Sequence, residues 1–392
     1  MIWSRRPVRV RAPATSANLG PGFDALGLAL ALYDEIEVSV TAGGLAVEVS
    51  GEGAATASAG EQHLVVRAMR AAFAEMGGQP PGIALRCANA IPHGRGLGSS
   101  AAAICSGLLA ARALAGPGGS GGSGGPGRPG EPALSDEQVF QLAAALEGHP
   151  DNVAACLAGG LAIAWAPRPG TPAAVTSGPG ASGPDARGPG AADPGAADPG
   201  ACGSAVRGPG APGARLLRVP VAATLRAVAC VPPVPLATEA ARQTLPPAVP
   251  YADAAANAAR SALLIAALTG APQVLFEATE DFLHQPYRAA IMPETAALLG
   301  ALRRAGAAAV VSGAGPAVLV LAFDGQEPSA EAVDSIARES GITWHVTPLR
   351  IDQQGAHVQQ GGLGVHSPDS AWFNQPETRF TGRAQAAQED PA

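Results

Sequence analysis

A glycine-rich stretch at residues 91–103 reads Ile91-Pro92-His93-Gly94-Arg95-Gly96-Leu97-Gly98-Ser99-Ser100-Ala101-Ala102-Ala103. Its three glycines stand at alternate positions and allow the backbone to turn its N–H groups toward one space. The Ser-Ser-Ala run that follows is typical of a helix start, whose unpaired N–H groups carry partial positive charge. The stretch therefore predicts a phosphate-binding loop that leads into a helix; an ordinary glycine-rich turn before a helix is the alternative.

The composition limits how such a loop could work. All 25 basic residues are arginine. Without lysine, the chain cannot form a Schiff base, hold pyridoxal phosphate in the usual way, or use the GxxxxGK[ST] phosphate loop. Any positive charge in the site must come from guanidinium groups, backbone dipoles or a metal ion.

Charge and cysteine content narrow the class of protein. The formal net charge is −7, and no basic cluster interrupts the sequence, which argues against nucleic-acid binding. No apolar run is long enough to span a bilayer, and no secretory leader is recognisable, so we expect a soluble cytoplasmic protein. The cysteines are odd in number and include no CxxC pair, so we expect buried, reduced thiols. They are Cys87, Cys105, Cys156, Cys202 and Cys230.

The 51 glycines and 37 prolines are unevenly distributed. Residues 116–132 and 167–213 consist largely of Gly, Pro, Ala and Ser, and we expect both to be disordered inserts. The polar tail after Ile351 is also expected to be disordered. The predicted organisation is a first domain over residues 1–166, an insert over 167–215, a second domain over 216–351 and a tail over 352–392.

Hydrophobic patterning predicts an α+β protein, because strands and helices alternate without an unbroken βαβ series. Strands are predicted at Val8–Arg11, Ile36–Val40, Leu45–Val49, Ile83–Cys87, Ala227–Val231, Ala308–Val311, Val318–Phe323 and Trp344–Leu349. Helices are predicted at Leu64–Met76, Ser99–Leu114, Ser135–Leu146, Asp253–Leu268, Pro272–Phe282, Glu294–Arg304 and Ser329–Ser340. Ser135 and Gln138 have the spacing of a capping box.

Two further motifs accompany the glycine-rich stretch and identify a resemblance. The run P-x-G-x-G-L-G-S-S-A-A resembles the ATP-binding motif of the GHMP kinases, and residues 12–27 (APATSANLGPGFDALG) are very similar to the opening of the homoserine kinases in that superfamily. Val311-Ser312-Gly313-Ala314-Gly315-Pro316 resembles the third superfamily motif. The resemblance implies a ribosomal-protein-S5-like first domain and a ferredoxin-like second domain.

The resemblance also implies an ATP site with Mg²⁺. Glu147, which precedes H-x-D-N, would bind the metal together with the Ser100 hydroxyl, and hard oxygens of this kind suit Mg²⁺. His63 stands where many homoserine kinases carry an asparagine near adenine. The implied ATP-binding residues are Pro92, His93, Gly94, Arg95, Gly96, Leu97, Gly98, Ser99, Ser100, Ala101, Ala102, His63, Gly313 and Gly315.

The implied substrate pocket draws on residues from both domains. Arg242 and Arg288 would bind an α-carboxylate, a task suited to the planar guanidinium fork. Asn152 would contact the reacting hydroxyl, so that Asn152, Glu147 and Ser100 form the catalytic set, without a dedicated general base. The implied substrate-binding residues are Asn18, Asp24, His149, Asp151, Asn152, Thr238, Arg242, Arg288 and Gly313.

The function that follows is ATP-dependent phosphorylation of the side-chain hydroxyl of L-homoserine on the route to threonine. Dimers are usual in the family, so a homodimer is an expected assembly. Two alternatives for the function of the folded chain remain: a GHMP kinase for a mevalonate-type or other small alcohol, and a ligand-binding regulator that has lost catalysis. A third hypothesis gives the Gly/Pro-rich tract a role in binding a partner, although an insert whose sequence drifts by mutation explains its composition more simply.

Overall fold

The computed structural model describes residues 2–55, 57–58, 60–115, 133–166, 213–326 and 328–359. The predicted insert at 116–132, nearly all of that at 167–213, and the predicted tail from residue 360 onward lie outside these residues. Cys202 lies outside them too, whereas Cys87, Cys105, Cys156 and Cys230 are free and buried, as predicted. No helix of the described residues has the length and apolarity needed to cross a bilayer.

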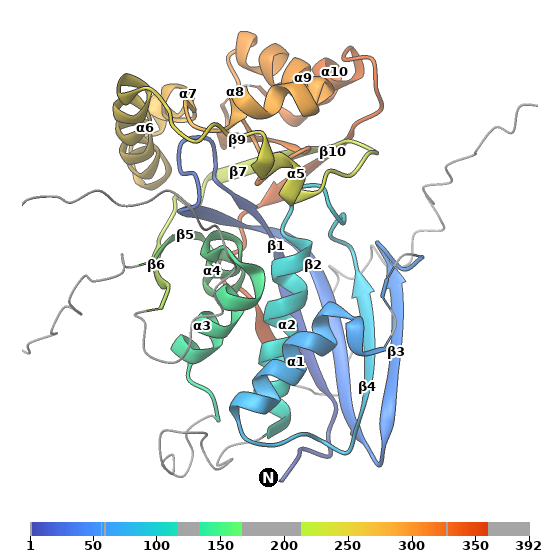
Figure 1. The fold of residues 1–392 in the computed structure, drawn as a ribbon. Coiled ribbons are helices and arrows are strands. Elements are labelled where there is room, and N and C mark those ends of the chain that lie inside the picture. The colour runs from blue at the N-terminus through green and yellow to red at the C-terminus, as the bar shows by residue number, and fades with distance from the viewer. Residues whose placement is uncertain are drawn as a thin grey trace, which may run out of the picture. The chain divides into compact units, whose positions relative to one another are not determined.

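Figure 1 shows helices packed on two β-sheets. The first sheet has the strand order β11-β1-β2-β4-β3, with β5 attached through β2 and β6 through β5. Its strands are β1 (Val8–Ala17), β2 (Leu26–Thr41), β3 (Gly44–Gly51), β4 (Gly82–Asn89), β5 (Leu161–Trp165), β6 (Arg215–Val219) and β11 (His357–Gln359). Its helical segments are η1 (Gly60–Gln62), α1 (Leu64–Glu75), α2 (Ser99–Ala115), α3 (Asp136–Glu147) and α4 (Pro150–Ala158).

The path of β1 and β2 brings the first motif to the rim of this sheet. Their register shifts between Pro13 and Ala14, where proline has no N–H for the ladder. Beyond this shift, the start of β2 pairs with β5, and its second half pairs with β4. The loop between β1 and β2, residues 18–25, therefore lies beside β5, where Ala164 donates its N–H to the Ala25 carbonyl. Gly27, at the start of β2, lies against the backbone of Asp151, in the H-P-D-N motif at the start of α4.

Helix α2 runs through the interior of the first domain. Its small residues, among them Ala101, Ala110 and Gly107, are buried, and the helix packs against both α1 and β1. Gly107 faces the backbone of α1 at Val65, where a side chain could not fit. This close packing fixes the start of α2 at the end of the glycine-rich stretch.

The second sheet has the order β10-β7-β9-β8 and is antiparallel throughout, which is the split βαβ arrangement of a ferredoxin-like fold. Leu298, Leu302 and Val333, from α9 and α10, pack with Val320 of its central strand. Its strands are β7 (Leu225–Val231), β8 (Ala308–Val311), β9 (Val318–Phe323) and β10 (His345–Arg350). Its helical segments are α5 (Thr238–Gln243), α6 (Tyr251–Thr269), η2 (Pro272–Val274), α7 (Leu275–Ala278), α8 (Gln285–Arg288), η3 (Ala289–Ile291), α9 (Pro293–Arg304) and α10 (Ala330–Arg338).

Most predicted elements are present, and the capping box at Ser135 and Gln138 is formed. The helix predicted over 272–282 is wrong: η2 and α7 end by Ala278. The Asp281 carboxylate accepts the N–H groups of Leu283, His284 and Gln285, so the backbone here turns instead of continuing the helix.

The predicted boundaries differ from the structure at two places. Residues 352–359 are ordered rather than disordered, because the Asp352 carboxylate accepts the N–H of Gly355 and the Tyr33 hydroxyl, and β11 then pairs with β1. Residues 215–219 form β6, which belongs to the first sheet although they were assigned to the insert and the second domain. The first sheet is therefore completed by β6, which precedes the second sheet in the chain, and by β11, which follows it.

Candidate active site

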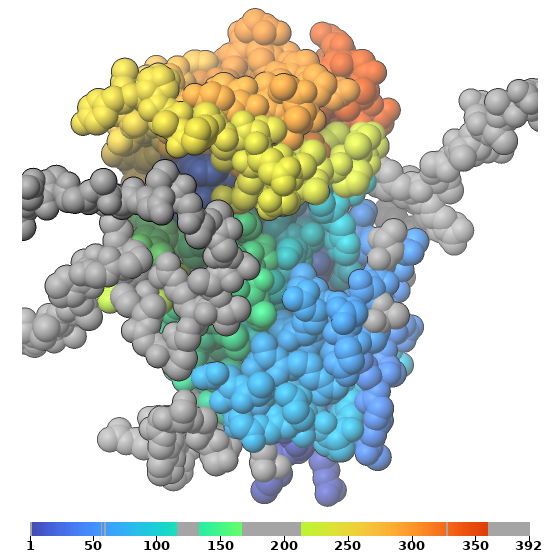
Figure 2. All heavy atoms as spheres, in the orientation of Figure 1, coloured from blue at the N-terminus to red at the C-terminus, as the bar shows by residue number. Residues whose placement is uncertain are grey.

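A cavity of about 130 Å³ collects most of the predicted site residues. Figure 2 shows a recess in which dark-blue N-terminal atoms are visible between yellow residues of the second domain and green residues of α3 and α4. The predicted residues that line the cavity are Asn18, Asp24, Gly94, Gly96, Gly98, Ser99, Ser100, Glu147, His149, Asp151, Asn152, Thr238, Arg242, Arg288 and Gly313. Ala17 and Ala314 complete the lining.

The backbone of the glycine-rich loop has the conformation that a phosphate site needs. Gly94, Gly96 and Gly98 have φ of 65°, 75° and 70°, in the left-handed region that favours glycine. Each carbonyl from Gly94 to Gly98 already accepts a hydrogen bond from a neighbour, so the peptide N–H groups are the polar groups left for a ligand. The donors are Leu236 N (2.8 Å), Ala317 N (3.3 Å), Ser312 Oγ (2.6 Å), Thr15 N (3.0 Å) and Ala102 N (3.0 Å), in chain order of the carbonyls.

Two buried polar side chains hold this loop in place. Asp34 Oδ1 accepts the N–H groups of Ala90 (2.8 Å) and Ile91 (2.9 Å), where β4 leads into the loop. Burial raises the pKa of Asp34 to about 6. Ser312 donates to the Gly96 carbonyl and lies 2.8 Å from Ser16 Oγ, which ties the third motif to the loop and to β1. The role of Asp34 was not predicted from the sequence. Its signal is a carboxylate at an inward-facing strand position, because a buried carboxylate requires hydrogen-bond donors.

Several predicted ATP-binding residues do not line the cavity. Arg95 donates to the carbonyls of His93, Pro232 and Pro233, so its side chain braces the loop against the end of β7. The others that do not line it are Pro92, His93, Leu97, Ala101, Ala102, His63 and Gly315. Of these, Leu97, Ala101 and Ala102 are buried in the core.

His93 lies close enough to His63 to affect its pKa. Burial is the main cause that lowers the pKa of both imidazoles, and His93 lowers the pKa of His63 further. His63 Nδ1 is buried and has no hydrogen-bond partner among the described residues. A neutral ring with one unused nitrogen remains compatible with the predicted contact to a nucleotide base.

Ser100 and Glu147 meet at the edge of the cavity. The Ser100 hydroxyl, in the first turn of α2, donates to Glu147 Oε2 at 2.7 Å, and burial raises the pKa of Glu147. No group of three or more His, Cys, Asp or Glu side chains suited to a metal occurs in the part of the chain that the structure describes. The pair nevertheless fits Mg²⁺, which typically uses one or two protein ligands beside phosphate oxygens and water.

The polar residues of the first motif have two different roles: one binds backbone groups of the protein and the other pairs with an arginine of the cavity. Asn18 donates to the Gly313 carbonyl at 2.8 Å and accepts the N–H of Asp24 at 2.9 Å, so its amide joins the motif to the third motif. The Asp24 carboxylate instead forms a bidentate ion pair with Arg242, at 2.6 and 3.1 Å. Asn18 lines the cavity, but its amide is occupied by backbone groups of the protein.

The two predicted carboxylate-binding arginines both lie near the ring of Phe23. Their guanidinium carbons lie 5.9 Å (Arg242) and 5.5 Å (Arg288) from the ring centroid. Arg288 is only 1% exposed and donates to the carbonyls of Ala241 and Gly313. The structure thus brings two guanidinium groups together in one cavity, and among the described residues Asp24 is the one direct ion-pair partner of Arg242.

The H-P-D-N motif starts α4 and places three side chains in the cavity. Asp151 is 3% exposed, its Oδ1 accepts the Asn152 N–H, and burial raises its pKa to about 6. Asn152 Oδ1 accepts the Thr15 hydroxyl at 2.8 Å, which leaves Nδ2 as the donor of this amide. Burial lowers the pKa of His149, which keeps its imidazole neutral near pH 7.

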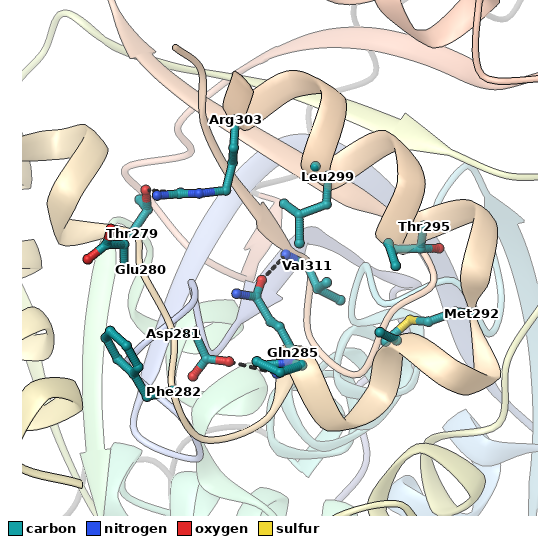
Figure 3. A pocket seen from close by; sticks show the side chains of 14 residues that line it. Thr279, Glu280, Asp281, Phe282, Gln285, Met292, Thr295, Leu299, Arg303 and Val311 are labelled. Carbon is teal, nitrogen blue, oxygen red and sulfur yellow. Dashed lines mark hydrogen bonds between the residues drawn. The ribbon is translucent and has the colours of Figure 1, made fainter. Parts of the chain in front are cut away.

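A larger cavity, of about 370 Å³, lies along the same segment that carries Arg288, residues 281–288 (Figure 3). Its lining is mainly apolar and includes none of the predicted site residues. In Figure 3 the side chains of Asp281 and Gln285 point into this region, and Gln285 Oε1 accepts the N–H of Val311. These contacts fix the backbone that presents Arg288 and Gly313 to the smaller cavity.

Comparison with known proteins agrees with the fold and the motifs. Residues 63–160 match the model of the GHMP kinases N terminal domain, and residues 256–342 match that of the GHMP kinases C terminal domain. The homoserine kinase of Streptomyces coelicolor is 45% identical over 351 residues, which cover 90% of this chain and 94% of that protein. The homoserine kinase of Clavibacter michiganensis is 42% identical over 356 residues, with 90% and 94% covered.

Among solved structures, a homoserine kinase from Cytophaga hutchinsonii superposes with a TM-score of 0.67 at 23% identity. The match covers 92% of this chain and 99% of that one, and at this identity it shows the fold. The fold and the identity to the bacterial relatives together establish that the chain belongs to the homoserine kinase family of the GHMP kinases.

Proposed function

We propose that this protein transfers the γ-phosphoryl group of ATP to the side-chain hydroxyl of L-homoserine, which gives ADP and O-phospho-L-homoserine on the route to threonine. One observation carries the proposal. A single cavity joins a loop and helix start suited to phosphate with two arginines and two aspartates suited to an amino-acid zwitterion. The reacting hydroxyl and the γ-phosphate would meet between these two sides.

The phosphate side works through backbone and helix dipoles. The N–H groups of residues 94–100 and the start of α2 would bind the phosphate oxygens, because the loop carbonyls already have partners. Ser100 and Glu147 would hold Mg²⁺, which when bound neutralises charge on the β- and γ-phosphates. No lysine is needed for this arrangement, in agreement with the composition.

The amino-acid side works through ion pairs. The α-carboxylate would bind between Arg242 and Arg288, and the α-ammonium would bind near Asp24 and Asp151. Asp24 pairs with Nη1 and Nη2 of the Arg242 guanidinium, and Arg242 Nε is buried without a hydrogen-bond partner among the described residues. A zwitterion can therefore insert between Asp24 and Arg242. The one ion pair between these side chains is then replaced by two, from the α-ammonium to Asp24 and from the α-carboxylate to Arg242, at little net electrostatic cost.

The reaction would depend on position and electrostatics more than on proton abstraction. Phosphoryl transfer has a loose transition state in which charge spreads over the γ-phosphate oxygens. Asn152 Nδ2, held by the bond from Thr15 to Oδ1, would orient the hydroxyl oxygen, and an amide cannot act as a base. The side chains of the cavity then act by holding the two reactants in line.

The proposal is tested by the release of ADP from purified full-length protein. We expect ADP release that requires both L-homoserine and Mg²⁺, with much lower rates for mevalonate or other small alcohols. A preference for another alcohol would point to a different GHMP kinase. Binding of homoserine without any ADP release would point to a regulator that has lost catalysis.

Glu147→Gln tests the metal site. We expect turnover to fall and to recover in part at higher Mg²⁺ concentration, because the amide oxygen is a weaker ligand than a carboxylate. Glu137→Gln, at an exposed position of the same helix, is the matched control and should leave the Mg²⁺ dependence unchanged. The same Mg²⁺ dependence in Glu147→Gln and the wild type would remove Glu147 from the metal site.

Asp151→Asn tests the role of the buried carboxylate. Burial raises the pKa of Asp151 from 3.8 to about 6, so the ionised side chain destabilises the folded state increasingly as pH rises from 4 to 6 and fully at pH 7. The asparagine variant avoids a cost on the order of 1–3 kcal/mol and should melt a few degrees higher at pH 7.

The same variant should bind homoserine more weakly, because the charge that faces the ammonium is lost. In the wild type, KM for homoserine should rise as pH falls below about 6, and this rise should be absent from Asp151→Asn. Loss of kcat with unchanged KM would instead identify Asp151 as the general base and would overturn the mechanism given above.

A homodimer and a cytoplasmic location complete the proposal. Both are inferences from the sequence. Sedimentation of the purified protein would measure whether it forms a dimer.

A further inference from the structure

His284 lies at the centre of a buried hydrogen-bonded group that joins two substrate-binding segments. Its side chain is 0% exposed and stacks on Phe23, with ring centroids 5.2 Å apart and planes at 28°. Nδ1 lies 3.0 Å from Arg288 Nη1, and Nε2 lies 2.8 Å from the Gly20 carbonyl. The imidazole thus contacts the arginine on one side and the loop of the first motif on the other.

The partners of the ring determine its protonation. Arginine can only donate, so Nδ1 must accept from Arg288 and cannot carry a proton. The Gly20 carbonyl can only accept, so the proton is on Nε2. Asp281 Oδ2 lies 3.6 Å from Nε2, but this carboxylate already accepts the N–H groups of His284 and Gln285. Burial lowers the pKa of His284, in agreement with a neutral ring.

The backbone beneath the ring is held independently of it. The Asp281 carboxylate accepts three successive N–H groups, and Gln285 Oε1 accepts the N–H of Val311, the first residue of the third motif (Figure 3). Both acceptors lie on the side of the larger cavity. His284 itself therefore projects from a fixed turn, and its two nitrogens are free to set the positions of Arg288 and of the loop at Gly20.

We infer that His284 is a positioning residue for substrate carboxylate recognition: its neutral imidazole orients the Arg288 guanidinium through Nδ1 and holds the first-motif loop, with Phe23, through Nε2. This inference rests on the proposed function, in which Arg288 binds the α-carboxylate of homoserine. It assigns to His284 no contact with the substrate and no proton transfer.

Two substitutions separate the two contacts. His284→Asn places an amide oxygen near the position of Nδ1 and can still accept from Arg288, but it does not reach Gly20. His284→Gln places an amide N–H near the position of Nε2 and can still donate to Gly20, but it leaves Arg288 without its acceptor. We propose to measure kcat and KM for both variants with L-homoserine, with L-homoserine amide, whose carboxylate is replaced by a neutral group, and with ATP.

For His284→Gln we expect KM for homoserine to rise about tenfold or more, in the range of one lost charge-assisted hydrogen bond. Discrimination between homoserine and its amide should fall by a similar factor, while KM for ATP stays within about twofold. His284→Asn should retain most of the discrimination and should lose thermal stability through the loop at Gly20.

Equal discrimination in His284→Gln and the wild type would overturn the inference, as would equal losses with all three substrates, which indicate a merely structural role. Absence of homoserine-dependent ADP release from the wild type would instead reject the proposed function. Thermal melting of each variant shows that the protein measured is folded.

Discussion

The structure of the site depends on the way in which the carbonyl groups of the glycine-rich loop are held. The carbonyls of residues 94–97 accept hydrogen bonds from neighbouring segments, which include β1, the third motif and the residues after β7, and the Gly98 carbonyl accepts from Ala102 of α2. A peptide unit whose oxygen is fixed outward presents its N–H in the opposite direction. The proposed phosphate site therefore depends on contacts behind the loop, several of them from loops of the second domain.

This arrangement explains how a chain without lysine can bind a triphosphate. Backbone amides and the start of α2 carry fixed partial charges that need no ionisable side chain. In the proposed site, the Ser100–Glu147 pair would provide oxygens for a metal ion at the edge of the same cavity. In the proposed site the arginines are then left for the amino acid, and Arg242 and Arg288 both lie near the ring of Phe23. The absence of lysine predicts this assignment of phosphate to backbone amides and metal and of the amino acid to arginine, and the geometry of the cavity agrees with it.

The sequence predicted the local features of this structure better than its long-range strand pairing. The capping box at Ser135 and the loop at residues 94–98 depend on residues close in sequence, and both were predicted. Strand β11 pairs with β1 across more than three hundred residues, and its three residues carry no alternating pattern that could have revealed it. A short edge strand is defined by its partner, which a single sequence does not show.

The same distinction applies to the site. Motif positions identified the lining of the cavity, but they did not show how each side chain is used. Asn18 serves the backbone, Arg95 braces the loop, and His284 joins Arg288 to Gly20. His284 lies four residues before Arg288, at a spacing that brings side chains together on a helix, so the signal was present. Its other partner, the Gly20 carbonyl, is distant in sequence, so a single sequence does not show the link between them.

The most direct test of the account is the affinity of Gly98→Ala for ATP, measured by calorimetry. Gly98 has φ of 70°, and a Cβ there would collide with the Thr15 hydroxyl. Gly77→Ala is the matched control for the backbone strain of about 1 kcal/mol, because Gly77 has φ of 80° with open space around it. Gly98→Ala should lose more stability than this control, because its Cβ also meets Thr15. If the loop backbone is the phosphate site, only Gly98→Ala should lose ATP affinity, by about tenfold or more. Wild-type affinity for ATP in folded Gly98→Ala would contradict the account.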